Sequence, residues 1–284
     1  MLKLVLPLQK EEYQKILREG EFWEVWADFY LEFEKKEKIK GERHRVVSLH
    51  APLSSGMDIS SSNARERKLT LIKLRVFLED FANGEYILVL HPGGKLKKGE
   101  KEGEREKYMF KSIEELLKWS EIYRFRIALE NLPPGYVGDN EKILGKILQT
   151  FPHPRLGLCI DTGHAHLTGN LKELLANFKE RIFILHVHDN NGWSDQHFPP
   201  PYGVIPWDEI LPLIPRDVPL VVEALPWGKS SISRMLEEVQ ALFTGKIVQS
   251  EGVFLKCKKC GHFLIEKGDN WSCLCGVGEK GDIQ

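Results

Sequence analysis

The sequence lacks a long hydrophobic run and a net charge of either sign. No apolar stretch approaches the roughly 20 residues that a membrane span needs. The opening MLKLVLPLQKEEYQ lacks the long apolar core and small-residue cleavage site of a signal peptide. A formal net charge of −1 gives no global electrostatic case for binding nucleic acid or an anionic membrane. We therefore expect a globular cytoplasmic protein without membrane contact, in which any polyanion is bound by a local patch.

The sequence also has no low-complexity tract, and no Gly-rich dinucleotide or phosphate-binding fingerprint follows an apolar run. What it has is a regular alternation of short runs rich in Val, Ile and Leu with segments that carry apolar residues at helical spacing. The eight runs are 2–8, 22–29, 45–51, 86–93, 126–131, 156–164, 182–189 and 220–225. The clearest helical segments are 11–20, 64–84, 109–123, 170–180 and 231–243.

Continuous apolar strands indicate a parallel sheet that is buried on both faces. Eight strand–helix units within residues 1–245 fit an α/β fold of the (β/α)8 TIM barrel type. A doubly wound open sheet is the alternative, which the missing Gly-rich fingerprint disfavours. After ALFTGKIVQSEG the pattern changes to a short, polar, cysteine-bearing tail, so we place a small second domain at 246–284. Cys159 lies inside an apolar run, and we interpret it as part of the core.

Polar side chains stand where the apolar runs end, which in a β/α barrel is where the chemistry takes place. One segment, HVHDNNGWSDQH, carries three histidines and two aspartates directly after the run RIFIL. The imidazoles and carboxylates expected at the barrel mouth are His50, His91, Glu130, Asp161, His164, His186, Asp195, His197 and Glu223. Each alone has an ordinary explanation, as a hydrogen-bonded histidine or a helix cap. Burying four carboxylates together is very costly unless cations are present, so the set predicts a metal site.

The donors in this set are imidazoles and carboxylates, without a thiolate. That combination suits Zn²⁺ or Mn²⁺ rather than Ca²⁺ or an iron–sulfur cluster. Nine donors are too many for one tetrahedral or octahedral ion. If one carboxylate bridges, they would serve two or three ions.

These residues carry a resemblance to a known group of enzymes. Residues 1–245 resemble the xylose isomerase-like TIM-barrel superfamily, and the donor set resembles that of the endonuclease IV family of AP endonucleases. The matching stretches are LHAP, HPG, ALEN, CIDTGHAH and SDQH, in this order. The resemblance implies a trinuclear zinc centre that cleaves the phosphodiester 5′ to an abasic site in DNA.

The resemblance also implies which residues share an ion. It assigns one zinc to His50, His91 and Glu130. It assigns a second zinc to Glu130 as a bridge, Asp161, His186 and Glu223. It assigns a third zinc to His164, Asp195 and His197. His188 stays unassigned, as a partner of a ligand, a substrate contact or a structural residue.

Two activities follow from such a centre. Clustered divalent ions provide a hydroxide near neutral pH and hold both oxygens of a phosphoryl displacement, so we expect a phosphodiester hydrolase. The carboxylates we expect in catalysis are Glu130, Asp161 and Glu223. The alternative is a sugar or sugar-phosphate isomerase or epimerase, because relatives with that activity hold one metal with a Glu, Asp, His, Glu quartet. The further donors count against that alternative, and the lack of overall basic charge counts against the endonuclease.

The tail resembles a zinc ribbon. Its candidate ligands are Cys257, Cys260, Cys273 and Cys275, with His262 as a substitute. In a reducing compartment this spacing favours metal over disulfides. A segment this small buries too little apolar surface to fold unaided, so we expect one structural Zn²⁺ to supply its folding free energy. The tail then either contacts nucleic acid or protein, or only caps the barrel or a dimer interface.

Overall fold

The computed structural model describes residues 2–8, 16–18, 20–34, 36–53, 56–82, 84–224, 231–245, 265–267 and 270–272. Eight parallel strands hydrogen-bond in sequence order and close on themselves through the pairing of β8 with β1. The predicted (β/α)8 barrel is therefore confirmed. The strands are β1 (Leu4–Leu8), β2 (Phe22–Trp26), β3 (Val46–His50), β4 (Ile87–Leu90), β5 (Arg126–Glu130), β6 (Leu156–Asp161), β7 (Ile182–Val187) and β8 (Leu220–Val222).

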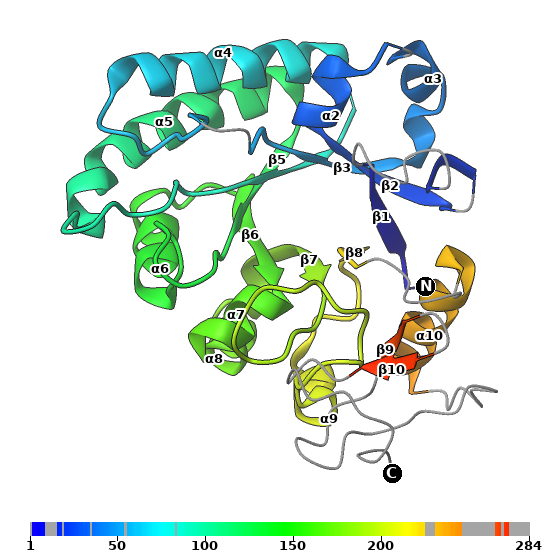
Figure 1. The fold of residues 1–284 in the computed structure, drawn as a ribbon. Helices are drawn as coiled ribbons and strands as arrows, with labels where there is room; N and C mark the ends of the chain where they lie inside the picture. Colours follow the sequence, from blue (N-terminus) through cyan, green and yellow to red (C-terminus); the bar gives the residue numbers. More distant parts are fainter. Residues whose placement is uncertain are drawn as a thin grey trace.

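Helices surround the barrel, and α4 and α5 lie side by side against one flank (Figure 1). The α-helices are α2 (Ala27–Glu32), α3 (Lys36–Gly41), α4 (Ala64–Asp80), α5 (Glu102–Tyr123), α6 (Glu141–Thr150), α7 (Thr162–Thr168), α8 (Leu171–Asn177), α9 (Trp207–Ile210) and α10 (Ile232–Thr244). Short 3₁₀ helices occupy Arg43–Arg45, Lys179–Arg181 and Leu211–Leu213. No helix in this described part of the chain is long and apolar enough to cross a membrane.

Several helices begin at a side chain that caps them. Asn63 accepts a hydrogen bond from the backbone N–H of Arg65 at the start of α4, and Asn140 does the same for α6. Asp161, the last residue of β6, caps α7 through the backbone N–H of His164 at 2.7 Å. The short β6–α7 junction therefore places a strand-end carboxylate and a first-turn histidine next to each other.

The second apolar run is shorter as a strand than its sequence suggests. Strand β2 ends at Trp26, and the chain turns at once into α2. The run 22–29 thus contains a strand and the start of a helix, since Ala27 and Phe29 are buried against the core from a helical backbone.

Two apolar clusters lie on opposite faces of the barrel wall. The larger lies between strands and helices and includes Leu88, Ile127 and Leu129. The smaller fills the barrel interior and consists of Val5, Ile87, Val89, Ala128, Cys159, Ile184 and Val221. The buried position predicted for Cys159 is confirmed. Because side chains alternate along a strand, the interior cluster fixes which of the remaining strand residues also point inward.

The tail contributes a two-stranded antiparallel hairpin, β9 (Ile265–Lys267) and β10 (Asn270–Ser272). The described residues do not include the predicted zinc ligands Cys257, Cys260, Cys273 and Cys275. They also do not include residue 246, where the predicted second domain begins.

Candidate metal centre

Successive side chains along a strand point to opposite faces of the sheet, and this alternation brings the predicted donors together inside the barrel. Ala128 faces inward on β5, so Glu130 does too; Cys159 likewise brings Asp161 inward on β6. The same spacing relates Val89 to His91, Ile184 to His186 on β7, and Val221 to Glu223 after β8. On β3, His50 follows Ser48 by two positions, and Ser48 hydrogen-bonds to the buried Glu24. The side chains that this alternation collects near the carboxyl ends are His50, His91, Glu130, Asp161, His186 and Glu223.

Four histidines at this mouth have their Nδ1 against a backbone carbonyl; for His188 it is the carbonyl of Asp189, at 3.4 Å. The Nδ1 of His50 lies 2.9 Å from the carbonyl oxygen of Ala51, and the Nδ1 of His197 lies 2.8 Å from that of Glu223. The Nδ1 of His164 lies 3.1 Å from the carbonyl oxygen of Asn131. A carbonyl only accepts, so each Nδ1 carries the proton and donates it, which leaves the Nε2 of each neutral ring as a lone pair.

Each of these Nε2 lone pairs faces a carboxylate. The Nε2 of His50 lies 3.3 Å from Glu130, and those of His164 and His197 each lie 3.2 Å from the same oxygen of Asp195. His50 and Glu130 are buried, and two buried electron-rich groups that face each other require a cation, either a second proton on the ring or a metal ion. Asp195 and His197 are partly exposed to solvent. The donor set thus fits divalent metal.

A further pair of atoms points to the same need. The Nδ1 of His186 and the Oε1 of Glu223 are 3.0 Å apart, and both are buried without a hydrogen-bond partner among the described residues. Buried polar atoms are almost always paired, so this exception requires an explanation. A shared cation would satisfy both atoms.

Side chains that each offer one ligand atom within 4.8 Å of the others form four overlapping groups. The first contains His50, His91 and Glu130. The second contains Glu130, Asp161 and His164. The third contains His164, His188, Asp195 and His197. The fourth contains Glu24, His50, His186 and Glu223.

All nine predicted donors therefore occur in one of these groups, but the expected second set is divided. Glu130 and Asp161 lie with His164, whereas His186 and Glu223 lie with Glu24 and His50. The expected first set forms a group as it stands, and the expected third set gains His188.

His188 is fully buried beside Asp161, with its Nε2 at 2.9 Å from Oδ1 and 3.1 Å from Oδ2. Its ring stacks on that of His197, with centroids 3.9 Å apart and planes at 7°. Imidazole binds a metal in the plane of its ring, so two parallel stacked rings are poorly arranged to share one ion. His188 is therefore better placed toward Asp161 than toward the ion of His197.

Glu24 is a site residue that the sequence analysis missed. It lies in the middle of β2, is fully buried, and reaches the Nε2 of His186 at 3.2 Å. A carboxylate is rarely buried without a partner, so the lone acidic residue within the apolar run FWEVW was a usable signal.

The electrostatics of the centre reflect the crowding of opposite charges. Burial lowers the pKa of His164, but Asp161 and the hydrogen bond with Asp195 raise it more, to about 10. Burial likewise opposes the charge on His197, whose contact with Asp195 lifts its pKa to about 9. In the metal-free protein these rings hold a second proton near neutral pH, so a proton takes the place of the ion.

The pKa values of the carboxylates Glu130 and Glu223 are lowered, in contrast to those of the histidines. Burial raises the pKa of Glu223, but His186 lowers it to about 2. Burial also raises the pKa of Glu130, and the charges of His186 and His91 bring it well below the usual range. Both carboxyl groups are therefore ionised at every pH at which the protein would work, as metal ligands must be.

Residues 19–223 match the model of a protein family described as "Xylose isomerase-like TIM barrel". The chain belongs to this family. An uncharacterized protein of Methanocaldococcus jannaschii is 33% identical over 178 residues, which is 60% of each chain. The chain therefore spans less than two thirds of that relative's length.

Two further similarities point to different activities. A probable endonuclease 4 of Aquifex aeolicus is 31% identical over 211 residues, which cover 66% of this chain and 72% of the relative. The crystal structure of a D-tagatose 3-epimerase-like protein superposes with a TM-score of 0.73 at 25% identity, covering 86% of this chain and 97% of that one.

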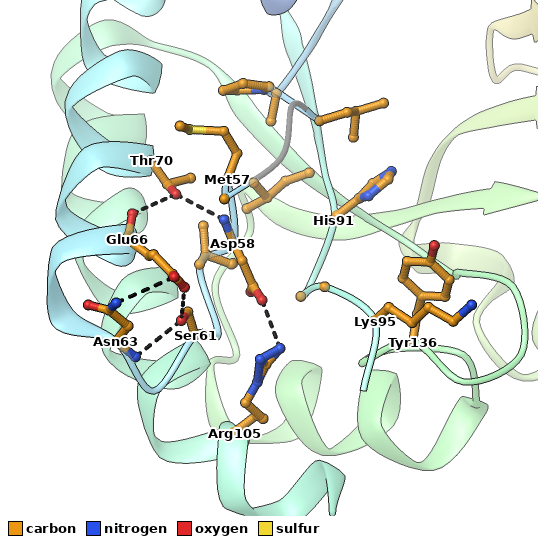
Figure 2. Close-up of a pocket in the computed structure, with 18 of the residues that line it drawn as sticks. Met57, Asp58, Ser61, Asn63, Glu66, Thr70, His91, Lys95, Arg105 and Tyr136 are labelled. Atoms are coloured by element: carbon orange, nitrogen blue, oxygen red, sulfur yellow. Dashed lines mark hydrogen bonds and ion pairs between the residues drawn. The ribbon is translucent and has the colours of Figure 1, made fainter. Parts of the chain in front are cut away.

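A cavity of about 780 Å³ adjoins the centre of this xylose isomerase-like barrel at His91. Its walls come from the segments that follow β3 and β4, and its lining includes Met57, Ser61, Lys95 and Arg105 (Figure 2). Arg105 donates to Asp58 at 2.8 Å, which ties the floor of the cavity to α5. The volume falls within the range of small-molecule sites.

Proposed function

We propose that this protein is a multinuclear metal-dependent phosphodiester hydrolase that resembles endonuclease IV and acts on abasic-site DNA. The chemistry rests on the barrel mouth, and the choice of DNA rests on the similarity to the probable endonuclease 4 of Aquifex aeolicus. Zn²⁺ is the ion that the imidazole and carboxylate donors favour, with Mn²⁺ as the alternative.

The single observation that carries the proposal is the position of Glu130. Its Oε2 lies 3.2 Å from the Nε2 of His91 and 3.3 Å from that of His50, whereas its Oε1 lies 3.6 Å from the Nδ1 of His186. The two oxygens of one carboxylate thus face imidazoles of two different ligand sets. That is the arrangement of a bridging ligand, which a centre with a single ion does not need.

The ion ligands are assigned as the family resemblance implies, which agrees with the first and third groups but not with the division of the second set. His50, His91 and Glu130 would hold one, and His164, Asp195 and His197 would hold another. Asp161, His186 and Glu223, with Glu130 as a bridge, would complete a third position. When bound, the ions supply Lewis-acid activation of a phosphoryl oxygen and lower the pKa of a water molecule.

The chain's own part in the reaction is to orient these groups. Backbone carbonyls hold His50, His164 and His197 with their Nε2 lone pairs turned inward. The low pKa values of Glu130 and Glu223 keep both carboxylates ionised in the resting protein. With Asp161 they would hold the ions beside the reacting phosphate.

The second candidate function is a metal-dependent sugar or sugar-phosphate isomerase or epimerase. The cavity beside His91 favours it, because a site of about 780 Å³ matches a small substrate better than a duplex. The structural similarity to a D-tagatose 3-epimerase-like protein adds support. In this reading Glu130 and Glu223, which both face the Nδ1 of His186, would exchange a proton beside a carbonyl.

The test begins with elemental analysis of the full chain, followed by two assays. Three ions in the barrel, with cleavage of a duplex that carries a synthetic abasic site, would support the hydrolase. One ion, with epimerisation of a ketohexose, would support the second candidate instead. His50→Ala and Asp195→Ala should abolish hydrolysis but spare much of an epimerase that needs one ion, so activity retained by both would refute the hydrolase.

We further propose that residues 246–284 form a separate zinc-ribbon domain beside the barrel domain of residues 1–245. Its structural Zn²⁺ would be held by Cys257, Cys260, Cys273 and Cys275. Cys260→Ser should then lower the zinc content by one ion without changing the ions of the barrel. If the ribbon binds nucleic acid, this variant should also weaken retention on a DNA column; unchanged retention would favour a protein contact or a capping role.

A further inference from the structure

Glu24 is a buried carboxylate with three hydrogen-bond partners. The Nε1 of Trp26 donates to its Oε1 at 3.0 Å, and the Oγ of Ser48 donates to its Oε2 at 2.7 Å. The Nε2 of His186 reaches the same Oε2 at 3.2 Å. Backbone pairing of Glu24 with Ser48 in adjacent strands keeps these groups in register. The carboxylate is therefore anchored at the wall of the barrel, below the strand ends.

His186 differs from three other histidines of the centre in the group that contacts the ring nitrogen turned away from the centre. His50, His164 and His197 each turn one nitrogen to a backbone carbonyl, whereas the Nε2 of His186 meets the Glu24 carboxylate. An ionised carboxylate accepts and does not donate. The Nε2 of His186 must therefore carry a proton. When the ring is neutral, as a metal ligand is, its lone pair lies on Nδ1.

That lone pair lies toward the carboxylates of Glu223 and Glu130. The Nδ1 of His186 is 3.0 Å from the Oε1 of Glu223 and 3.6 Å from the Oε1 of Glu130. A carboxylate–histidine–metal arrangement of this type fixes the tautomer and the ring orientation and strengthens the ligand.

We propose that Glu24 is a positioning residue, which holds His186 as the Nε2–H tautomer so that its Nδ1 binds the metal ion shared with Glu223. This inference rests on the metal centre of the proposed function but not on its substrate. It holds equally for a hydrolase and for an epimerase.

The rival role for Glu24 is direct ligation, because Glu24 shares a group with His50, His186 and Glu223. The hydrogen bonds favour positioning. An ion bound by Glu24 would have to compete with the donors on Trp26 and Ser48 for the same two oxygens. Direct ligation by Glu24 would also leave the buried Nδ1 of His186 without a partner.

The experiment is long-range ¹H–¹⁵N correlation NMR of the histidine rings in the full, zinc-loaded chain, with His186→Gln used to assign the signals. Positioning by Glu24 predicts a proton on the Nε2 of His186 and zinc on its Nδ1. A proton on Nδ1, or zinc on Nε2, would overturn the inference. This measurement is made on the unaltered protein, so it does not depend on whether a variant folds.

A variant then tests the cause. In Glu24→Gln one of the two oxygens becomes an N–H₂ donor, which must face either Trp26 or the Ser48 and His186 side. We expect one ion to bind about 10- to 100-fold more weakly in competition with a chelator. The ring of His186 should then populate both tautomers.

The matched control is Glu102→Gln, because Glu102 accepts from the backbone N–H of Gly138 at 3.0 Å, away from the barrel interior. The Glu102→Gln variant should leave the zinc affinity and the tautomer of His186 unchanged. Wild-type zinc affinity in Glu24→Gln, with the control also unchanged, would refute the positioning role. Neither readout requires turnover, so a failure of the proposed hydrolase activity would be recognised separately.

Discussion

Metal removal should make the stability of this protein fall as the pH rises. The reason is the raised pKa of His164, about 10 in the folded chain against 6.5 when unperturbed. A group whose pKa is higher in the folded state contributes stability that is complete below the unfolded pKa. That contribution is lost as the pH rises through the folded value. The window is therefore pH 6.5 to about 10.

The magnitude follows from the size of the interval. Each pH unit within it removes about 1.4 kcal/mol per proton, which gives a ceiling of about 5 kcal/mol for His164. His197, with a pKa of about 9, adds less, because its side chain is 38% exposed and it shares Asp195 with His164. We expect a total loss of a few kcal/mol in unfolding free energy.

The assay is urea unfolding followed by circular dichroism at pH 6.5, 8 and 9.5, with chelator and with added zinc. The chelated protein should become less stable at each step, and the zinc-loaded protein should not, since the ion replaces the second proton. His164→Gln should flatten the slope of the chelated protein. His153→Gln, an exposed histidine beside Glu121, should leave the slope unchanged. A chelated protein whose stability is constant or rises with pH would refute the reasoning.

Three other predictions concern the site directly. Glu130→Gln should lower the zinc content by two ions on elemental analysis, because one oxygen faces His91 and the other faces His186; loss of one ion would contradict bridging. Gly163→Ala would place a Cβ 2.0 Å from the His188 ring and should cost about 1–3 kcal/mol in urea unfolding. Met57→Trp should fill part of the cavity and raise KM for a small substrate severalfold with kcat retained, whereas unchanged kinetics would place the substrate elsewhere.

The donor residues at the strand ends could be predicted from the sequence because two regularities of the sequence identify the same positions. Short apolar runs mark the buried strands, which are three to six residues long, and the alternation of side chains along a strand decides which terminal residue points inward. Glu130 and Asp161 follow an interior Ala128 and Cys159 by two positions each, so their meeting inside the barrel needs no knowledge of long-range contacts. For the same reason the barrel itself was predictable from the alternation of runs and helical segments.

The grouping of donors around individual ions was not predictable in the same way, because it depends on the stagger of one strand against the next. Asp161 is level with His186 in the sheet, yet its side chain meets His188. Glu24 precedes the end of β2 by two residues, and only its register with Ser48 places it against His186. A rule that inspects the last residue of each strand therefore passes over it.

The same side chains support both candidate chemistries, and metal occupancy decides between them. With one ion between His186 and Glu223, His91 would be free to bind a substrate that fills the cavity, and Asp195 would bind no metal. With ions also at the first and third groups, those residues become ligands and the bridging position of Glu130 gains its purpose. The number of ions per barrel therefore constrains the reaction before any substrate is known, because a ligand that is engaged by metal cannot also recognise a sugar hydroxyl.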